Sequence, residues 1–128
     1  MLVIGLVFAL VGALIHVYIF VLESFLWTSK RGRAVFGMSE EGALATRELA
    51  FNQGFYNLFL AVAVVLGAVL VGAGLTSAGA ALVYAGAGSM VLAGTVLAVS
   101  SPSKLRPALI QLGAPLVGVV LLTLGLVG

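Results

Sequence analysis

Four long apolar stretches, separated by shorter polar segments, dominate the chain. They cover residues 2–27, 51–71, 78–99 and 108–127. A helix of about 20 apolar residues crosses the roughly 30 Å hydrocarbon core of a bilayer, and each stretch is long enough to do so. The joins at residues 72–77 and 100–107 are short, so successive spans must run antiparallel. The pattern predicts an all-α membrane protein, a four-transmembrane-helix antiparallel up-down bundle that forms one domain over residues 1–128.

The connection at residues 28–48 is the one that is long enough to contain structure of its own. Ser39 is a suitable N-cap, and Glu40 and Glu41 after it suit the positive end of a helix dipole. We therefore predict a short helix that begins after Ser39 and runs on toward, or directly into, the second span.

Composition supports this class of protein. Hydrophobic residues make up 62% of the 128 residues and charged residues only 8%, and the mean hydropathy is +1.29, which a water-soluble domain of this size would not tolerate. The chain has no cysteine, so disulfide exchange and thiolate metal sites are excluded. The first stretch lacks a basic leader and is too long for a signal peptide, and we expect it to be retained.

The basic residues predict the orientation of the bundle. All six lie in or beside the first and third connections, and they are Lys30, Arg31, Arg33, Arg47, Lys104 and Arg106. These two connections lie on the same side of the membrane, which the positive-inside rule makes the cytoplasmic side. Both termini are then extracytoplasmic. The net charge is only +2, so the basic pI does not indicate nucleic-acid binding.

Two ionisable residues interrupt the first span. His16, the only histidine, and Glu23 are seven residues apart, which places them on one face of a helix. Ionisable groups are costly in lipid and usually face the interior of a bundle. Because Trp27 suits the membrane interface, Glu23 should lie about 6 Å and His16 about 16 Å deeper. We identify His16 and Glu23 as the candidate catalytic pair.

Polar side chains of the second span are expected to face this pair. Asn52, Gln53, Tyr56 and Asn57 form a wedge on one side of the helix. We expect Asn52 and Gln53 at the depth of Glu23, and Asn57 nearly at the depth of His16. Gln111 lies about a turn into the fourth span and could join them. The candidate ligand-binding residues of this cytoplasm-facing pocket are Trp27, Asn52, Gln53, Tyr56, Asn57 and Gln111.

Two segments resemble those of a known family. They are Glu-Ser-Phe-Leu-Trp-Thr-Ser-Lys-Arg-Gly-Arg-Ala-Val-Phe-Gly at residues 23–37 and Asn-Gln-Gly-Phe-Tyr-Asn at residues 52–57. Together with a histidine at position 16, they resemble a family of small bacterial four-helix membrane proteins, domain-of-unknown-function family thirteen-hundred-and-four. The resemblance covers essentially the whole chain and implies a four-helix fold with no established activity. It favours a multi-pass protein of the bacterial cytoplasmic (inner) membrane.

Three functions fit these residues. The first is binding or sensing of a lipophilic small molecule, such as a lipid, sterol-like or quinone-like compound, in the intramembrane pocket. The second is an isomerase-like acid/base enzyme, because burial disfavours the charged forms of both His16 and Glu23, which could then exchange a proton. The third is a proton-coupled transporter of the small multidrug type that uses Glu23. The position of Glu23 near the cytoplasmic end of its helix, rather than at the midplane, counts against this third function.

Simpler structural roles remain open for the same residues. His16 could bond a neighbouring carbonyl or Tyr56, Glu23 could pair with Arg31 or Lys30, and the amides could join helices at about 0.6 kcal/mol each. One histidine and one carboxylate are too few for a metal site unless a homodimer doubles them. We expect no metal and no cofactor. The expected partners are membrane lipids, a lipophilic small molecule and, as an open alternative, a second copy in a homodimer, but no nucleic acid.

Overall fold

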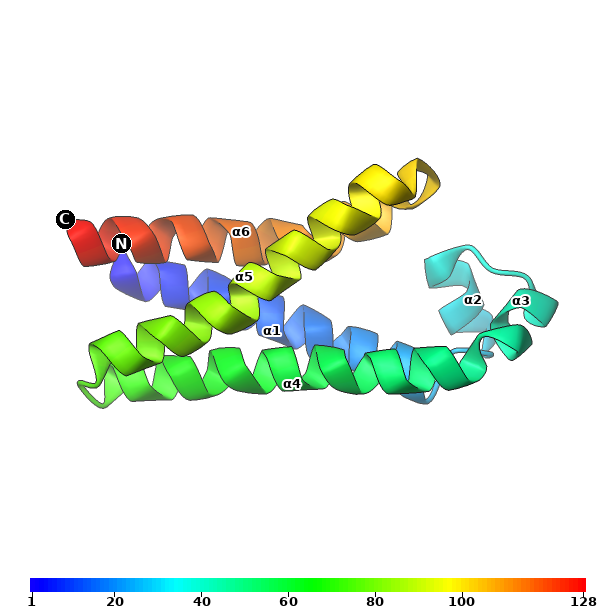
Figure 1. Ribbon diagram of the computed structural model, residues 1–128, viewed down its shortest axis with the longest axis horizontal. Helices are drawn as coiled ribbons and strands as arrows, with labels where there is room; N and C mark the ends of the chain where they lie inside the picture. The colour runs from blue at the N-terminus through cyan, green and yellow to red at the C-terminus, as the bar shows by residue number, and fades with distance from the viewer.

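Four long helices form the body of the protein (Figure 1). The computed structural model describes residues 1–128 and contains no strand. The long helices are α1 (Leu2–Ser24), α4 (Arg47–Gly72), α5 (Thr76–Ser100) and α6 (Leu105–Val127). All four are long and apolar enough to cross a membrane. The predicted all-α four-helix membrane bundle is confirmed, and the chain is a multi-pass membrane protein.

The two ends of the bundle carry different elements (Figure 1). Three short helices, α2 (Lys30–Phe36), α3 (Glu40–Ala45) and the 3-10 helix η1 (Pro102–Lys104), lie at the end opposite the two chain termini. The six Lys and Arg residues lie at this end or flank it in sequence, and we call it the basic end. The other end, with both termini and the turn between α4 and α5, is the terminal end.

The helix predicted after Ser39 is present as α3. The Ser39 hydroxyl accepts a hydrogen bond from the backbone N–H of Gly42 at 3.1 Å, which is the expected N-cap. Only Thr46 separates α3 from α4. The second long helix therefore begins at Arg47, four residues before the predicted start of the second span.

Helix α2 was not predicted, and the first span ends earlier than expected. The Ser29 hydroxyl caps α2 by accepting from the N–H of Gly32 at 3.1 Å, and Gly37 ends it with a left-handed φ of 65°. Gly32 lies so close to the Leu26 carbonyl that no side chain would fit between them. The chain therefore makes a tight turn after α1, which ends at Ser24 rather than at Trp27.

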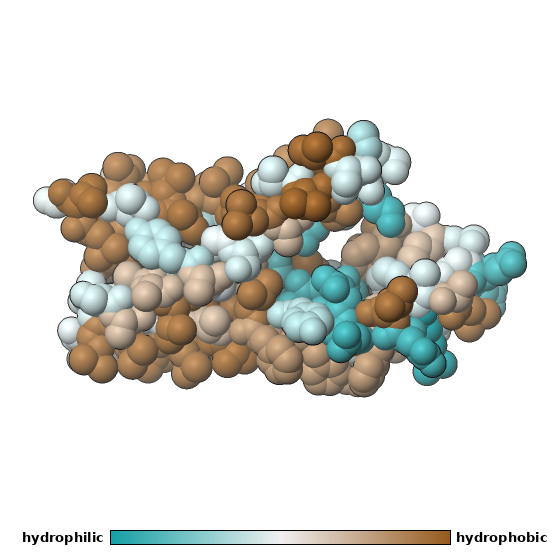
Figure 2. Space-filling view, in the orientation of Figure 1, coloured by the Kyte–Doolittle hydropathy of each residue, from teal (hydrophilic) through white to brown (hydrophobic).

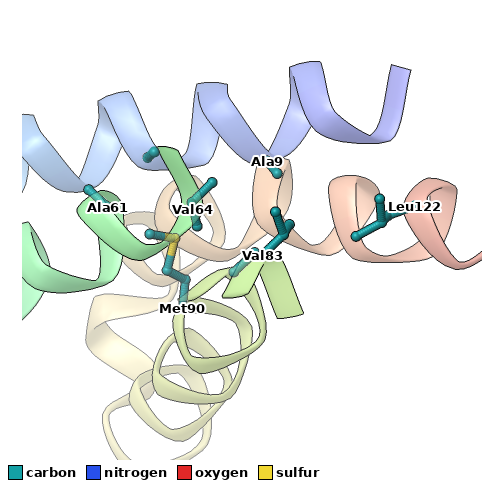
Figure 3. Packing of buried hydrophobic residues seen from close by; sticks show 8 residues of the cluster. Ala9, Ala61, Val64, Val83, Met90 and Leu122 are labelled. Atoms are coloured by element: carbon teal, nitrogen blue, oxygen red, sulfur yellow. The ribbon is translucent and has the colours of Figure 1, made fainter. Parts of the chain in front are cut away.

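Small residues allow the helices to approach closely. A Cβ atom on Gly79 of α5 would lie 2.5 Å from the carbonyl oxygen of Gly67 on α4, so only glycine fits at this crossing. The buried core is built mostly of alanine and valine. In Figure 3, Met90 points from α5 toward α4 between these small side chains. The core residues are Ala9, Ala13, Ala61, Val64, Val83, Ala87, Met90 and Leu122.

Helix α5 changes partner along its length (Figure 1). Near the terminal end Gly79 and Gly86 pack against α4, whereas Gly94, nearer the basic end, packs against Leu112 of α6. Because α5 crosses the bundle from α4 to α6, the bundle opens between α4 and α5 at the basic end. This opening exposes the part of α4 that carries its polar residues.

Candidate functional site

Hydrophilic side chains gather on the basic half of the bundle. Figure 2 shows them over α4, beside a hollow that separates it from the turn between α5 and α6. The terminal half of the same face is predominantly apolar. The polar groups of the membrane-spanning helices are therefore concentrated where the helices diverge.

A hydrogen bond between Glu23 and Asn57 joins α1 to α4. The Asn57 amide nitrogen Nδ2 donates to Oε2 of Glu23 at 2.7 Å, and the pair is partly buried. Beside it, the Ser24 hydroxyl donates to the backbone carbonyl of Phe51 at 3.0 Å. Gly54 lies directly against Ser24, which lets the two helices approach closely enough for both hydrogen bonds to form.

The predicted depth of Asn57 was wrong by about one helical turn. Asn57 was expected near the depth of His16, but it contacts Glu23. Gln53 was expected at the depth of Glu23, and it does line a cavity together with Glu23. Gly54, next to it, packs against Ser24 and the Phe20 carbonyl, and this close approach sets the register between α1 and α4.

The polar wedge of α4 does not face inward as one unit. Gln53 lines a cavity together with Glu23, and Asn57 bonds Glu23. Asn52 is exposed, and so is Tyr56, at 58%. The inward position predicted for Asn52 and Tyr56 is therefore wrong, because α5 diverges from α4 at this level and no neighbouring helix covers them. Gln53 is exposed as well, although it lines the second cavity.

His16 is buried apart from Glu23. Its side chain is 1% exposed, and its Nδ1 lies 2.9 Å from the carbonyl oxygen of Gly12. A carbonyl only accepts, so Nδ1 carries the proton, and the Nε2 of a neutral ring keeps the lone pair. His16 lines neither of the two cavities that Glu23 lines. The predicted sharing of one partner or cavity by the two residues is not found, and His16 has the simpler role of a ring bonded to a nearby carbonyl.

The first cavity lies between α1, α2 and α6, and we call it the α1–α2–α6 cavity. Its volume is about 220 Å³. Most of its wall is aliphatic or aromatic, whereas Glu23 and Gln111 bring polar atoms from two different helices. The predicted association of Gln111 with Glu23 is thus present. The lining residues are Ile15, Tyr18, Ile19, Leu22, Glu23, Val35, Phe36, Pro107, Ile110 and Gln111.

A second cavity, of about 260 Å³, lies on the α4 side of Glu23. Trp27 and Gln53 line it with Glu23. The Trp27 indole N–H donates to the hydroxyl of Thr46 at 3.0 Å, and its ring lies 5.0 Å from that of Phe36. Trp27 therefore belongs to the connection that covers the site rather than to the face of α1, where the spacing had placed it.

Helix α2 is held over the α1–α2–α6 cavity by Arg31. Its Nε donates to the Tyr18 hydroxyl at 2.7 Å, and the guanidinium carbon lies 5.6 Å from the centre of the Tyr18 ring. Arg31 is therefore engaged by Tyr18 and does not pair with Glu23. The one ion pair within 4.0 Å joins Arg33 to Glu40 at 3.8 Å, so the alternative pairing of Glu23 with Lys30 is not found either.

These groups define what the site can do chemically. Glu23 can accept hydrogen bonds, or hold a charge, at the boundary between the two cavities. Gln111 can both donate and accept. No three His, Cys, Asp or Glu residues lie close enough together to supply a metal-ligand set. The arrangement suits recognition of a polar group attached to an apolar body.

Comparisons with known proteins identify the family. No curated protein matches the chain, and no solved structure does. The family model described as "Protein of unknown function (DUF1304)" matches residues 10–123. This match includes α4 and α5 in full, most of α1 and α6, the connection with α2 and α3, and every residue of the two cavities. The chain therefore belongs to the DUF1304 family of proteins of unknown function.

Proposed function

We propose that the protein binds or senses a lipophilic small molecule in the α1–α2–α6 cavity. The observation that carries this proposal is the combination of a mainly apolar wall with Glu23 and Gln111 in a membrane-spanning bundle. Pockets for small molecules typically have such walls, with a few polar groups that orient the ligand.

The cavity volume limits what can enter. An apolar cavity of about 150 Å³ holds one benzene molecule, so about 220 Å³ accommodates one substituted ring or a short chain segment. A larger lipid, sterol-like or quinone-like molecule would insert only its polar end, and the remainder would stay among the acyl chains. The α1–α2–α6 cavity is thus suited to binding the polar end of a lipophilic ligand.

We also propose the orientation that the basic residues favour. The basic end faces the cytoplasm, both termini are extracytoplasmic, and the membrane is the bacterial cytoplasmic membrane. All six Lys and Arg residues support this orientation, because the terminal end carries none. The cavity then lies in the cytoplasmic half of the bilayer.

Single cysteines test the orientation without background labelling, since the chain has no cysteine. Ser77, near the terminal end, and Ser103, at the basic end, are both exposed. A membrane-impermeant maleimide added to intact spheroplasts should label Ser77→Cys at once and Ser103→Cys only after permeabilisation. The reverse labelling pattern would show that the orientation is wrong.

A cavity-filling substitution tests the binding proposal. Ile19 lines the cavity, whereas Leu14 on the same helix is 71% exposed on the lipid-facing side. In native mass spectrometry, the wild type and Leu14→Trp should retain a co-purified small molecule. Ile19→Trp should lose at least about nine-tenths of that adduct, because its indole occupies the cavity. Equal adducts in all three proteins, or none in any, would contradict binding at this site.

The geometry favours the alternative functions less. An acid/base enzyme would use His16 with Glu23, but these residues have separate partners, Gly12 and Asn57. A proton-coupled transporter of the small multidrug type would need its carboxylate near the middle of the membrane. Glu23 instead lies in the last turn of α1.

A further inference from the structure

Glu23 is a carboxylate in a membrane-spanning helix that has no cationic partner in the protein. Its hydrogen bond from Asn57 is to a neutral amide and engages only Oε2. The side chain of Arg31 donates a hydrogen bond to Tyr18 instead, and no Lys, Arg or His nitrogen lies within 4.0 Å of Glu23. An uncompensated charge in a low-dielectric site is costly, so intramembrane carboxylates usually face a partner or a pathway.

Aromatic residues line both cavities together with Glu23. Tyr18 and Phe36 line the α1–α2–α6 cavity with Glu23, and Trp27 lines the second cavity. Aromatic faces attract cations, and the attraction grows when the cation is desolvated. The Tyr18 ring already has the Arg31 guanidinium 5.6 Å from its centre, although Arg31 itself does not line the cavity.

We propose that the lipophilic ligand is a cation, an amine or a quaternary ammonium compound, whose charge lies against Glu23. This inference rests on the binding function proposed above and narrows the class of ligand. The carboxylate supplies the counter-charge through its free oxygen Oε1, Tyr18 and Phe36 supply ring faces, and the aliphatic wall holds the apolar body. An anionic ligand would be repelled by the Glu23 carboxylate, whereas a cation stabilises the charged form that burial otherwise disfavours.

Two probes of the same shape, one charged and one neutral, separate the contribution of charge to affinity from that of apolar packing. The cation is benzyltrimethylammonium, and neopentylbenzene is its neutral carbon isostere. Both are titrated against the protein in dodecyl maltoside micelles, with correction for partition of each probe into empty micelles. Trp27 is the only tryptophan. It lines the second cavity with Glu23, and its ring lies 5.0 Å from that of Phe36, which lines the α1–α2–α6 cavity. Its fluorescence therefore reports binding through Phe36 and Glu23.

The charge of Glu23 should control the preference between the two probes. The wild type should bind the cation at least tenfold more tightly than the isostere. Glu23→Gln should lose this preference and keep its affinity for the isostere within about twofold. Glu41→Gln removes one negative charge from exposed α3 and should behave as the wild type. Glu23→Asp, which keeps the charge, should retain the preference.

The outcomes distinguish this inference from the binding function. If the wild type binds both probes equally, the cavity binds apolar molecules but the cation inference is wrong. If the wild type binds neither probe, the inference of a cationic ligand and the proposed binding function are both wrong. If Glu23→Gln does not fold, the inference is tested by whether the wild type and Glu23→Asp bind the cation more tightly than the isostere. A wild type that binds the two probes equally overturns the inference.

Discussion

Replacing Gly79 with leucine lowers the thermal stability of the bundle, whereas the same replacement at Gly88 on the same helix leaves it unchanged or raises it. A Cβ atom on Gly79 would lie 2.5 Å from the Gly67 carbonyl oxygen and 2.7 Å from the backbone nitrogen of Val71. These are backbone atoms of α4 and cannot move aside without separating the helices. Overpacking of this kind costs about 1–3 kcal/mol, and we expect the upper end of that range.

Gly88 is the matched control for this substitution. It lies in the same helix, and a Cβ atom there would meet nothing within 4 Å. Removing a glycine from a helix interior stabilises the helix by up to about 1 kcal/mol. Thermal unfolding in micelles, followed by circular dichroism, should show a midpoint lower by roughly 5–10 °C for Gly79→Leu only. Equal midpoints for the two variants would show that α4 and α5 do not cross at Gly79.

Removing Asn57 destabilises the protein mainly because it leaves Glu23 without its donor. Asn57→Leu should cost about 1–3 kcal/mol of unfolding free energy, which is typical when a buried polar group loses its partner. In a Glu23→Leu background the same change should cost much less. The wild type, the two single variants and the double variant are unfolded by SDS titration in mixed micelles, which gives the coupling energy between Glu23 and Asn57. We expect about 1–2 kcal/mol because the hydrogen bond is charge-assisted.

A neutral interhelical hydrogen bond provides the comparison. The Tyr84 hydroxyl on α5 lies 2.7 Å from the Thr123 hydroxyl on α6. The cycle built from Tyr84→Phe and Thr123→Val should give a coupling near 0.6 kcal/mol, the average for such bonds in membranes. If the changes in unfolding free energy caused by the Glu23 and Asn57 substitutions were additive, the two side chains would not interact in the membrane. The hydrogen bond between them would then contribute nothing to stability.

Helix α2 illustrates why part of the connection escaped prediction. The sequence contains its signals, a serine N-cap at Ser29 and a glycine C-cap at Gly37. A helix of seven residues is nevertheless unstable by itself, so local signals do not establish that it forms. It is held by tertiary contacts, namely Arg31 with Tyr18 and Gly32 against Leu26. Those contacts depend on how the chain turns after α1.

The sequence indicated which polar residues could lie near Glu23 but not how they are arranged. Asn57 bonds Glu23, whereas Gln111 and Gln53 line separate cavities on either side of it. Tyr18 and Phe36 were not predicted, because an aromatic residue in an apolar stretch gives no signal that distinguishes a cavity wall from a lipid contact. Arg31 was considered as one of the basic residues that predict the orientation and as a partner for Glu23, and its bond to Tyr18 became evident only in three dimensions.

The sequence by itself determined that the protein lies in a membrane and that four helices cross it. Both depend on the length of the apolar stretches and on where the charges lie, which follow from the free energy of transfer into lipid. The sequence also placed one carboxylate and one imidazole within the first crossing. Only the tertiary structure decided the depth offset between α1 and α4, the divergence of α5, and the separate partners of His16 and Glu23. The physical reason is that all these helices are equally soluble in lipid, so their register is set by close contacts between distant glycines and small side chains.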